Sequence, residues 1–221
     1  MSDFDTDSSP ENEWDDGGDL AWNEFDWELY LREQDEAVHR YLGFYESCRQ
    51  SPTRIDDVAA HMGWEALSDA ESGETREGAE ESAFVDDVYT LQKNPVFIAT
   101  KALYLGLKRS WELKACDPAK VPQGLALALL VSLQRGEEQA VMAIQALDFG
   151  DYAMAVALFK RALAGLNETF TQLSSEEVER HVVVRDYRDD ARQRLFDLRE
   201  IWLRVVEDCR EELDRPVDEE S

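Results

Sequence analysis

Apolar residues recur at intervals of three and four along most of this chain, and no segment shows sustained period-two alternation. The first pattern is typical of amphipathic helices, and the second would indicate half-buried strands. The one cluster of β-branched residues, Val182 to Val184, lies inside a helical pattern. The sequence therefore predicts an all-α fold, a bundle of five or six helices.

Helix start and stop signals divide the predicted helical domain, residues 19–215, into its elements. Asn94 and Pro95 mark a strong start, because Asn caps a helix and Pro fits the first helical position. Gly150 and Asp151 predict a tight turn between two helices. The expected helices cover residues 19–50, 55–64, 95–115, 123–149, 151–173 and about 175–213.

Two of these helices have a distinctive pattern. The helix at 123–149 begins with a stretch that is apolar all round, so we expect it to be the central helix. The last helix, if continuous over its 39 residues, would span about 58 Å. It carries a heptad-like seam with 4-3-4-3-4 spacing, formed by Ala191, Leu195, Leu198, Trp202, Val205 and Cys209. These patterns predict a long C-terminal helix in the bundle.

The charge is unusually negative and unevenly distributed. The 221 residues include 49 acids and 23 bases, a net charge of −26, with −21 in residues 1–89, +3 in 90–165 and −8 in 166–221. This balance argues against binding to nucleic-acid backbone or to anionic membrane, because both require basic patches. We expect a disordered acidic tail at 1–18, a flexible acidic loop at about 66–83 and an acidic tail at 216–221.

The cysteines and the chain start indicate the cellular compartment. Cys48, Cys116 and Cys209 are far apart and form no CxxC pair, and the first residues lack the basic and apolar regions of a signal peptide. The most apolar run, Leu125 to Leu133, has nine residues, whereas a membrane span needs about 20. We therefore expect a cytoplasmic protein with no membrane contact and with reduced thiols.

The segment after the predicted turn resembles the second helix of a tetratricopeptide repeat. The matching residues are Gly150, Tyr152, Ala155, Phe159, Ala162 and Leu163. No second copy follows at a 34-residue period, and a solenoid needs at least three units. The resemblance implies one α-hairpin of this type at about 137–163, with Tyr152 and Phe159 filling the space between its helices.

Three short patterns are compatible with metal chemistry. Glu36-x-x-His39 matches the Glu-x-x-His element of ferritin-like di-iron bundles, although neither of the other two histidines supplies a second element. The pairs Glu176-x-x-Glu179 and Glu211-x-x-Asp214 are similar to the paired acids of all-α nucleotide pyrophosphohydrolases, which bind Mg²⁺. We expect no catalytic residue, metal or cofactor; Glu36 and His39 are the weak metal candidates.

The leading functional prediction is a non-enzymatic protein–protein interaction or scaffold module. Its surface would combine the basic helix 95–115 with the hairpin and would meet an acidic partner, either another protein or the protein's own acidic tail. The candidate partner-binding residues are Lys101, Lys108, Arg109, Lys114, Tyr152 and Phe159. Two alternatives remain: a metal-dependent helical-bundle enzyme of either type above, and an acidic nucleic-acid mimic that competes for a basic partner.

Overall fold

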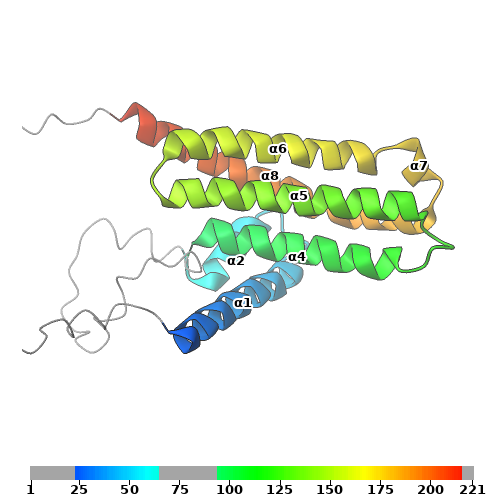
Figure 1. Cartoon of the computed structure of the whole chain (residues 1–221), viewed down its shortest axis with the longest axis horizontal. Helices are drawn as coiled ribbons and strands as arrows, with labels where there is room; N and C mark the ends of the chain where they lie inside the picture. Colours follow the sequence, from blue (N-terminus) through cyan, green and yellow to red (C-terminus); the bar gives the residue numbers. More distant parts are fainter. Residues whose placement is uncertain (1–22, 65–93, 216–221) are drawn as a thin grey trace, which may run out of the picture.

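The computed structural model describes residues 23–64 and 94–215. All regular elements in these ranges are helices, which confirms the all-α prediction (Figure 1). They are α1 (Glu24–Ser47), α2 (Arg54–Met62), α4 (Pro95–Ala115), α5 (Gln123–Asp148), α6 (Tyr152–Leu173), α7 (Glu176–Glu179) and α8 (Val182–Asp214). The predicted tails at 1–18 and 216–221 and the loop at 66–83 lie outside the described residues.

Four long helices form the bundle. α5 packs against α4 and α6, and α8 packs against α6 and α4, so the four close into a ring. Figure 1 shows these helices side by side, with α1 inclined across α4 and the short α2 beside it. All six residues of the predicted seam on α8 are buried, which confirms that this long C-terminal helix packs along the bundle.

The prediction that the helix at 123–149 would be the central helix is wrong. α4 packs against α1, α5 and α8, whereas α5 packs against α4 and α6. On α5, Leu127, Val131 and Met142 are each more than half exposed. An apolar composition makes every face of a helix suitable for burial, but packing decides which faces receive a neighbour. None of the described helices is long and apolar enough to cross a membrane.

Local signals set the ends of α4, α5 and α6 as expected. The Asn94 side chain accepts hydrogen bonds from the backbone N–H groups of Val96 at 3.0 Å and Phe97 at 3.2 Å, and Pro95 occupies the first turn. Gly150 has a φ of +74°, a conformation that glycine adopts without a steric penalty. These contacts confirm the predicted helix start and the predicted turn.

The last predicted helix is not continuous. α7 ends at Glu179, α8 begins at Val182, and His181 between them has extended backbone angles. Val178 and Val184 are both fully buried. Six residues turn a straight helix by about 600°, which would place these two side chains about 120° apart around the axis. The break lets both valines reach the core.

A buried aspartate on α8 joins α1 and α2 to the bundle. Asp197 is only 4% exposed. It accepts a hydrogen bond from the Tyr45 hydroxyl at 2.5 Å and from Arg54 Nε at 2.6 Å, and Arg54 Nη2 donates to its second oxygen. Burial raises the pKa of Tyr45 above its ordinary value, and the hydrogen bond to Asp197 makes the next largest contribution in the same direction. Tyr45 therefore stays protonated and acts as a donor at neutral pH.

A second group of charged residues extends this junction. Arg194 on α8 donates to Glu46 on α1 at 2.6 Å, and its guanidinium lies 5.4 Å from the centre of the Tyr45 ring. Arg49, just after α1, forms an ion pair with Asp190 of α8. Long polar side chains therefore connect the α1–α2 unit to α8.

Gly136 allows α5 to pass close to Tyr104 of α4. α5 continues through Gly136 without interruption. A Cβ atom at this position would lie 2.5 Å from the Tyr104 hydroxyl oxygen and 3.4 Å from the ring carbon that bears it. Tyr104 is fully enclosed by the core, so its ring cannot simply swing away.

We expect Gly136→Ala to lower the free energy of unfolding by about 1–2 kcal/mol, because overpacking outweighs the better helix propensity of alanine. Urea denaturation measures this change. Gly165→Ala is the matched control: nothing lies within 4 Å of its added Cβ, so this variant should gain about 0.5–1 kcal/mol. Adding Tyr104→Phe to Gly136→Ala should recover most of the loss. A Gly136→Ala protein as stable as the wild type would contradict the packing constraint.

Candidate functional site

An open groove of about 750 Å³ runs between α4 and α5. Its lining combines charged side chains from both helices with apolar side chains from α5. The residues that define it are Lys101, Lys108 and Glu112 on α4, and Leu130, Gln134, Glu137, Glu138, Val141 and Met142 on α5. We call it the α4–α5 groove.

The charged floor of the groove is an ion triad. Lys101 and Lys108 are seven residues apart, about two helical turns, so they share one face of α4. Lys101 Nζ donates to Glu137 Oε1 at 2.8 Å, and Lys108 Nζ donates to Glu137 Oε2 at 2.5 Å. Glu137 is 7% exposed. Two charge-assisted hydrogen bonds, one to each carboxylate oxygen, offset the cost of burying its charge.

Tyr104 lies on α4 between the two lysines in sequence and is buried. Burial raises the pKa of its hydroxyl, and the nearby negative charge of Glu137 raises it further. The phenol therefore stays neutral at physiological pH. It therefore adds no charge to the triad.

The groove as a whole is slightly acidic. Its lining contains two lysines and three glutamates. Glu112 and Glu138 are exposed, whereas Glu137 is buried between the lysines. Both ammonium groups are already bonded to Glu137. Glu137 offsets one of the two positive charges, and Glu112 and Glu138 bring the net charge of the groove to −1.

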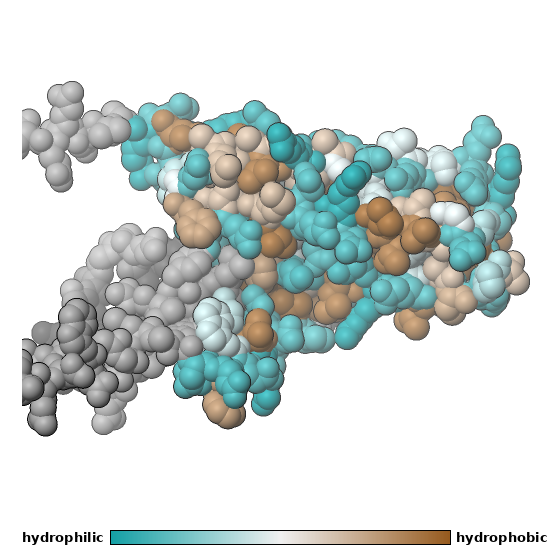
Figure 2. All heavy atoms as spheres, in the orientation of Figure 1, coloured by the Kyte–Doolittle hydropathy of each residue, from teal (hydrophilic) through white to brown (hydrophobic). Residues whose placement is uncertain are grey.

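Three exposed apolar residues adjoin the groove on the outer face of α5. We call them the apolar stripe, and the polar residues Gln134 and Glu138 interrupt it on the same face. Leu127, Val131 and Met142 are 60%, 52% and 51% exposed. Their spacing places them within about 60° of one another around the helix axis. Figure 2 shows hydrophobic side chains among hydrophilic ones on this side of the molecule. Half-buried Leu130 and Val141 connect the stripe to the groove wall.

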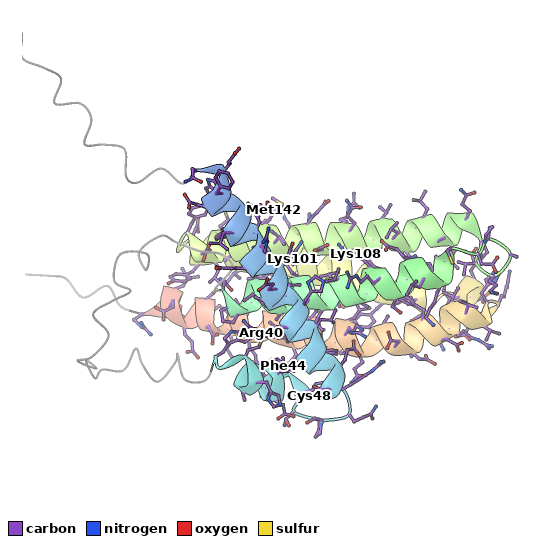
Figure 3. All side chains as sticks on the ribbon, turned by 90° about the horizontal axis from the view of Figure 1, so that it is seen from below. Arg40, Phe44, Cys48, Lys101, Lys108 and Met142 are labelled. Atoms are coloured by element: carbon purple, nitrogen blue, oxygen red, sulfur yellow. The ribbon has the colours of Figure 1, made fainter. Side chains whose placement is uncertain are left out.

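Figure 3 relates this region to α1. The labelled side chains of Lys101, Lys108 and Met142 lie to one side of α1 in this view, toward α4 and α5. Arg40, Phe44 and Cys48 follow α1 itself at four-residue intervals. Phe44 stacks on His61 of α2, with ring centres 5.3 Å apart. Phe44 therefore belongs to the packing between α1 and α2.

The other candidate partner-binding residues lie elsewhere. Arg109 is exposed and Lys114 is half-buried, but neither lines the groove. Tyr152 is half-buried at the first position of α6. Phe159 is fully buried, with its ring centre 6.4 Å from that of Trp202, so a partner cannot reach it in this structure.

Of the six candidates, the structure therefore brings only Lys101 and Lys108 together. The sequence analysis missed Glu137 and Met142. The seven-residue spacing of the lysines was a usable signal for a shared face. Nothing local in the sequence indicated that Glu137 would lie opposite that face.

The metal candidates remain separate. Glu36 and His39 are exposed, and His39 Nδ1 lies 2.7 Å from the Asp35 carbonyl oxygen. The acidic pairs 176/179 and 211/214 flank opposite ends of α8, whose 33 residues span about 50 Å. Over residues 23–64 and 94–215, no three His, Cys, Asp or Glu side chains are placed to hold one metal ion.

No protein-family model, curated protein or solved structure matches this chain. α5 and α6 do form a helical hairpin around the turn at Gly150. The resemblance of its second helix to a tetratricopeptide repeat stays a prediction, because an ordinary bundle hairpin has the same geometry.

Proposed function

We propose that this protein is a non-enzymatic interaction module that binds an amphipathic helical segment of a protein partner. The segment lies along the α4–α5 groove and the adjoining stripe on α5. The observation that carries this proposal is that Leu127, Val131 and Met142 share one face of α5 and are each more than half exposed. An exposed apolar stripe beside a groove is typical of helix-in-groove recognition.

The partner segment carries basic residues on either side of its apolar face. Glu112 and Glu138 are exposed in the groove, whereas Lys101 and Lys108 are half-buried and share Glu137. The whole chain has a net charge of −26. A field of this sign speeds the approach of a basic partner and slows that of an acidic one. This chemistry differs from the acidic partner expected from sequence, because Lys101 and Lys108 are engaged by Glu137.

A synthetic peptide tests the surface directly. The probe is a helical peptide with leucines at i, i+4 and i+7 and lysines elsewhere, and fluorescence anisotropy measures its binding to the full chain. We expect Val131→Glu and Met142→Glu each to weaken binding at least tenfold, since each places a charge in the apolar contact. Affinity should also fall as the salt concentration rises.

Two controls accompany this experiment. Leu203→Glu changes a partly exposed leucine on α8, which is not a neighbour of α5 in the bundle ring, and should leave the affinity unchanged. A peptide of the same composition, scrambled so that its leucines share no face, should bind at least tenfold more weakly than the probe. Equal binding of the two peptides, or no effect of either groove variant, would contradict the proposal.

A photo-reactive amino acid identifies the natural partner. Placed at position 142, it should cross-link to a basic amphipathic segment in extracts of the native host. The same group at position 203 should give no such product. Identical products from both positions would show that capture does not depend on the groove.

A further inference from the structure

A second, smaller pocket lies between α2, α4 and α8 and is independent of the α4–α5 groove. Its volume is about 190 Å³. Apolar side chains form most of its wall, including Ile55 and Ala59 from α2, Ala99 from α4 and Val205 from α8. A pocket of this size is below the range of about 300–1,000 Å³ for small-molecule sites. It fits one large apolar side chain.

One polar group in this wall is unsatisfied. Tyr41 is 1% exposed, and its hydroxyl has no hydrogen-bond partner among the described residues. Its ring stacks on Trp64, with the ring centres 5.6 Å apart. A buried hydroxyl without a partner destabilises a fold. A chain segment that docks here with a backbone carbonyl near Tyr41 would remove this penalty.

The chain itself leaves and returns at this pocket. Trp64 immediately precedes residues 65–93, Pro95 follows them by one residue, and both line the pocket. Residues 65–93 contain nine acids and, near their end, the apolar residues Phe84, Val85, Val88 and Tyr89. Phe84 precedes Pro95 by eleven residues, a maximum reach of about 37 Å. Attachment at both ends gives this cluster an effective concentration at the pocket in the millimolar range.

We propose that this pocket is the docking site for residues 84–89 of the same chain. Phe84 is the anchor rather than Tyr89, because its side chain has no polar group and the charged residues of the wall, Asp56 and Arg204, already pair with each other. A backbone carbonyl of the segment accepts the hydrogen bond of Tyr41. This intramolecular contact connects α2 to α4 on the side of the bundle where the two helices face α8.

Hydrogen–deuterium exchange of the full chain, followed by mass spectrometry, tests this docking. After correction for intrinsic rates, we expect amides at 84–90 to exchange at least tenfold more slowly than those at 70–78. Phe84→Ser and the pocket-filling variant Ala99→Leu should each abolish this difference. Ala164→Leu, the same substitution at an exposed position of α6, should preserve it.

Three outcomes would overturn the proposal. They are exchange of 84–90 at intrinsic rates in the wild type, undiminished protection in folded Ala99→Leu, and protection that rises with protein concentration. The last would assign the pocket to a second copy of the chain. If Ala99→Leu fails to fold, Tyr41→Phe replaces it, because it keeps the pocket and removes only the hydroxyl. This variant should reduce protection several-fold, and unchanged protection would then count against the proposed hydrogen bond.

Discussion

Replacing Asp197 by alanine is expected to lower the free energy of unfolding by about 3 kcal/mol, the lower end of the range for breaking a buried charge pair. The substitution removes the acceptor for both the Tyr45 hydroxyl and the Arg54 guanidinium. Asp197 is nearly enclosed, but the Arg54 side chain is 18% exposed, so water can partly solvate the released charge. Urea denaturation at pH 7 measures the loss.

Two variants on the same helix make this experiment specific. Asp189→Ala removes an exposed carboxylate that pairs with Arg188, and we expect a change within about 0.5 kcal/mol. Asp197→Asn keeps the side-chain volume and removes the charge, so its loss should lie between those of the two alanine variants. In Asp197→Ala, amides of α1 and α2 should exchange faster than those of α5 and α6. Equal losses for Asp189→Ala and Asp197→Ala would refute the role of Asp197 as the link.

A second large effect is expected at alkaline pH. Tyr41, Tyr45, Tyr104 and Tyr187 are all buried, and burial raises the pKa of each above its ordinary value of 10.0. The folded chain therefore keeps protons that the unfolded chain releases. The resulting stability is complete below pH 10 and is lost as the pH rises toward the folded pKa values.

Linkage gives the size of this effect. When the pH rises from 10 to 11, the free energy of unfolding falls by about 1 kcal/mol for each of these tyrosines. For the four tyrosines together the free energy of unfolding falls by about 4 kcal/mol, which is a large part of the total stability of a typical domain. We therefore expect cooperative unfolding over this range.

Simultaneous absorbance and circular dichroism spectra measure the alkaline transition. The buried tyrosines should ionise in the same step in which helix content is lost. Tyr104→Phe should move the midpoint to higher pH, because one fewer group releases a proton on unfolding. Complete tyrosine ionisation with full helix content would contradict the prediction.

The candidate site was only partly predictable from sequence. The spacing of Lys101 and Lys108 showed that they share a face, since that follows from the geometry of one helix. The position of Glu137 depends on the axial shift and the rotation of α5 relative to α4, and no local sequence pattern contains that information. Phe159 shows the same limit, because an aromatic residue suited to a partner surface is equally suited to packing against Trp202.

By itself, the sequence determined the helical class, most helix ends and the buried seam of α8. These features depend on periodicity, capping and turn residues within a few positions of each other, as at Asn94 and Gly150. Only the tertiary structure decided that α5 is not the central helix, that the last helix breaks at His181, and that Glu137 bridges two lysines. These features arise from contacts between distant parts of the chain, where the burial of one side chain depends on which other helix lies against it.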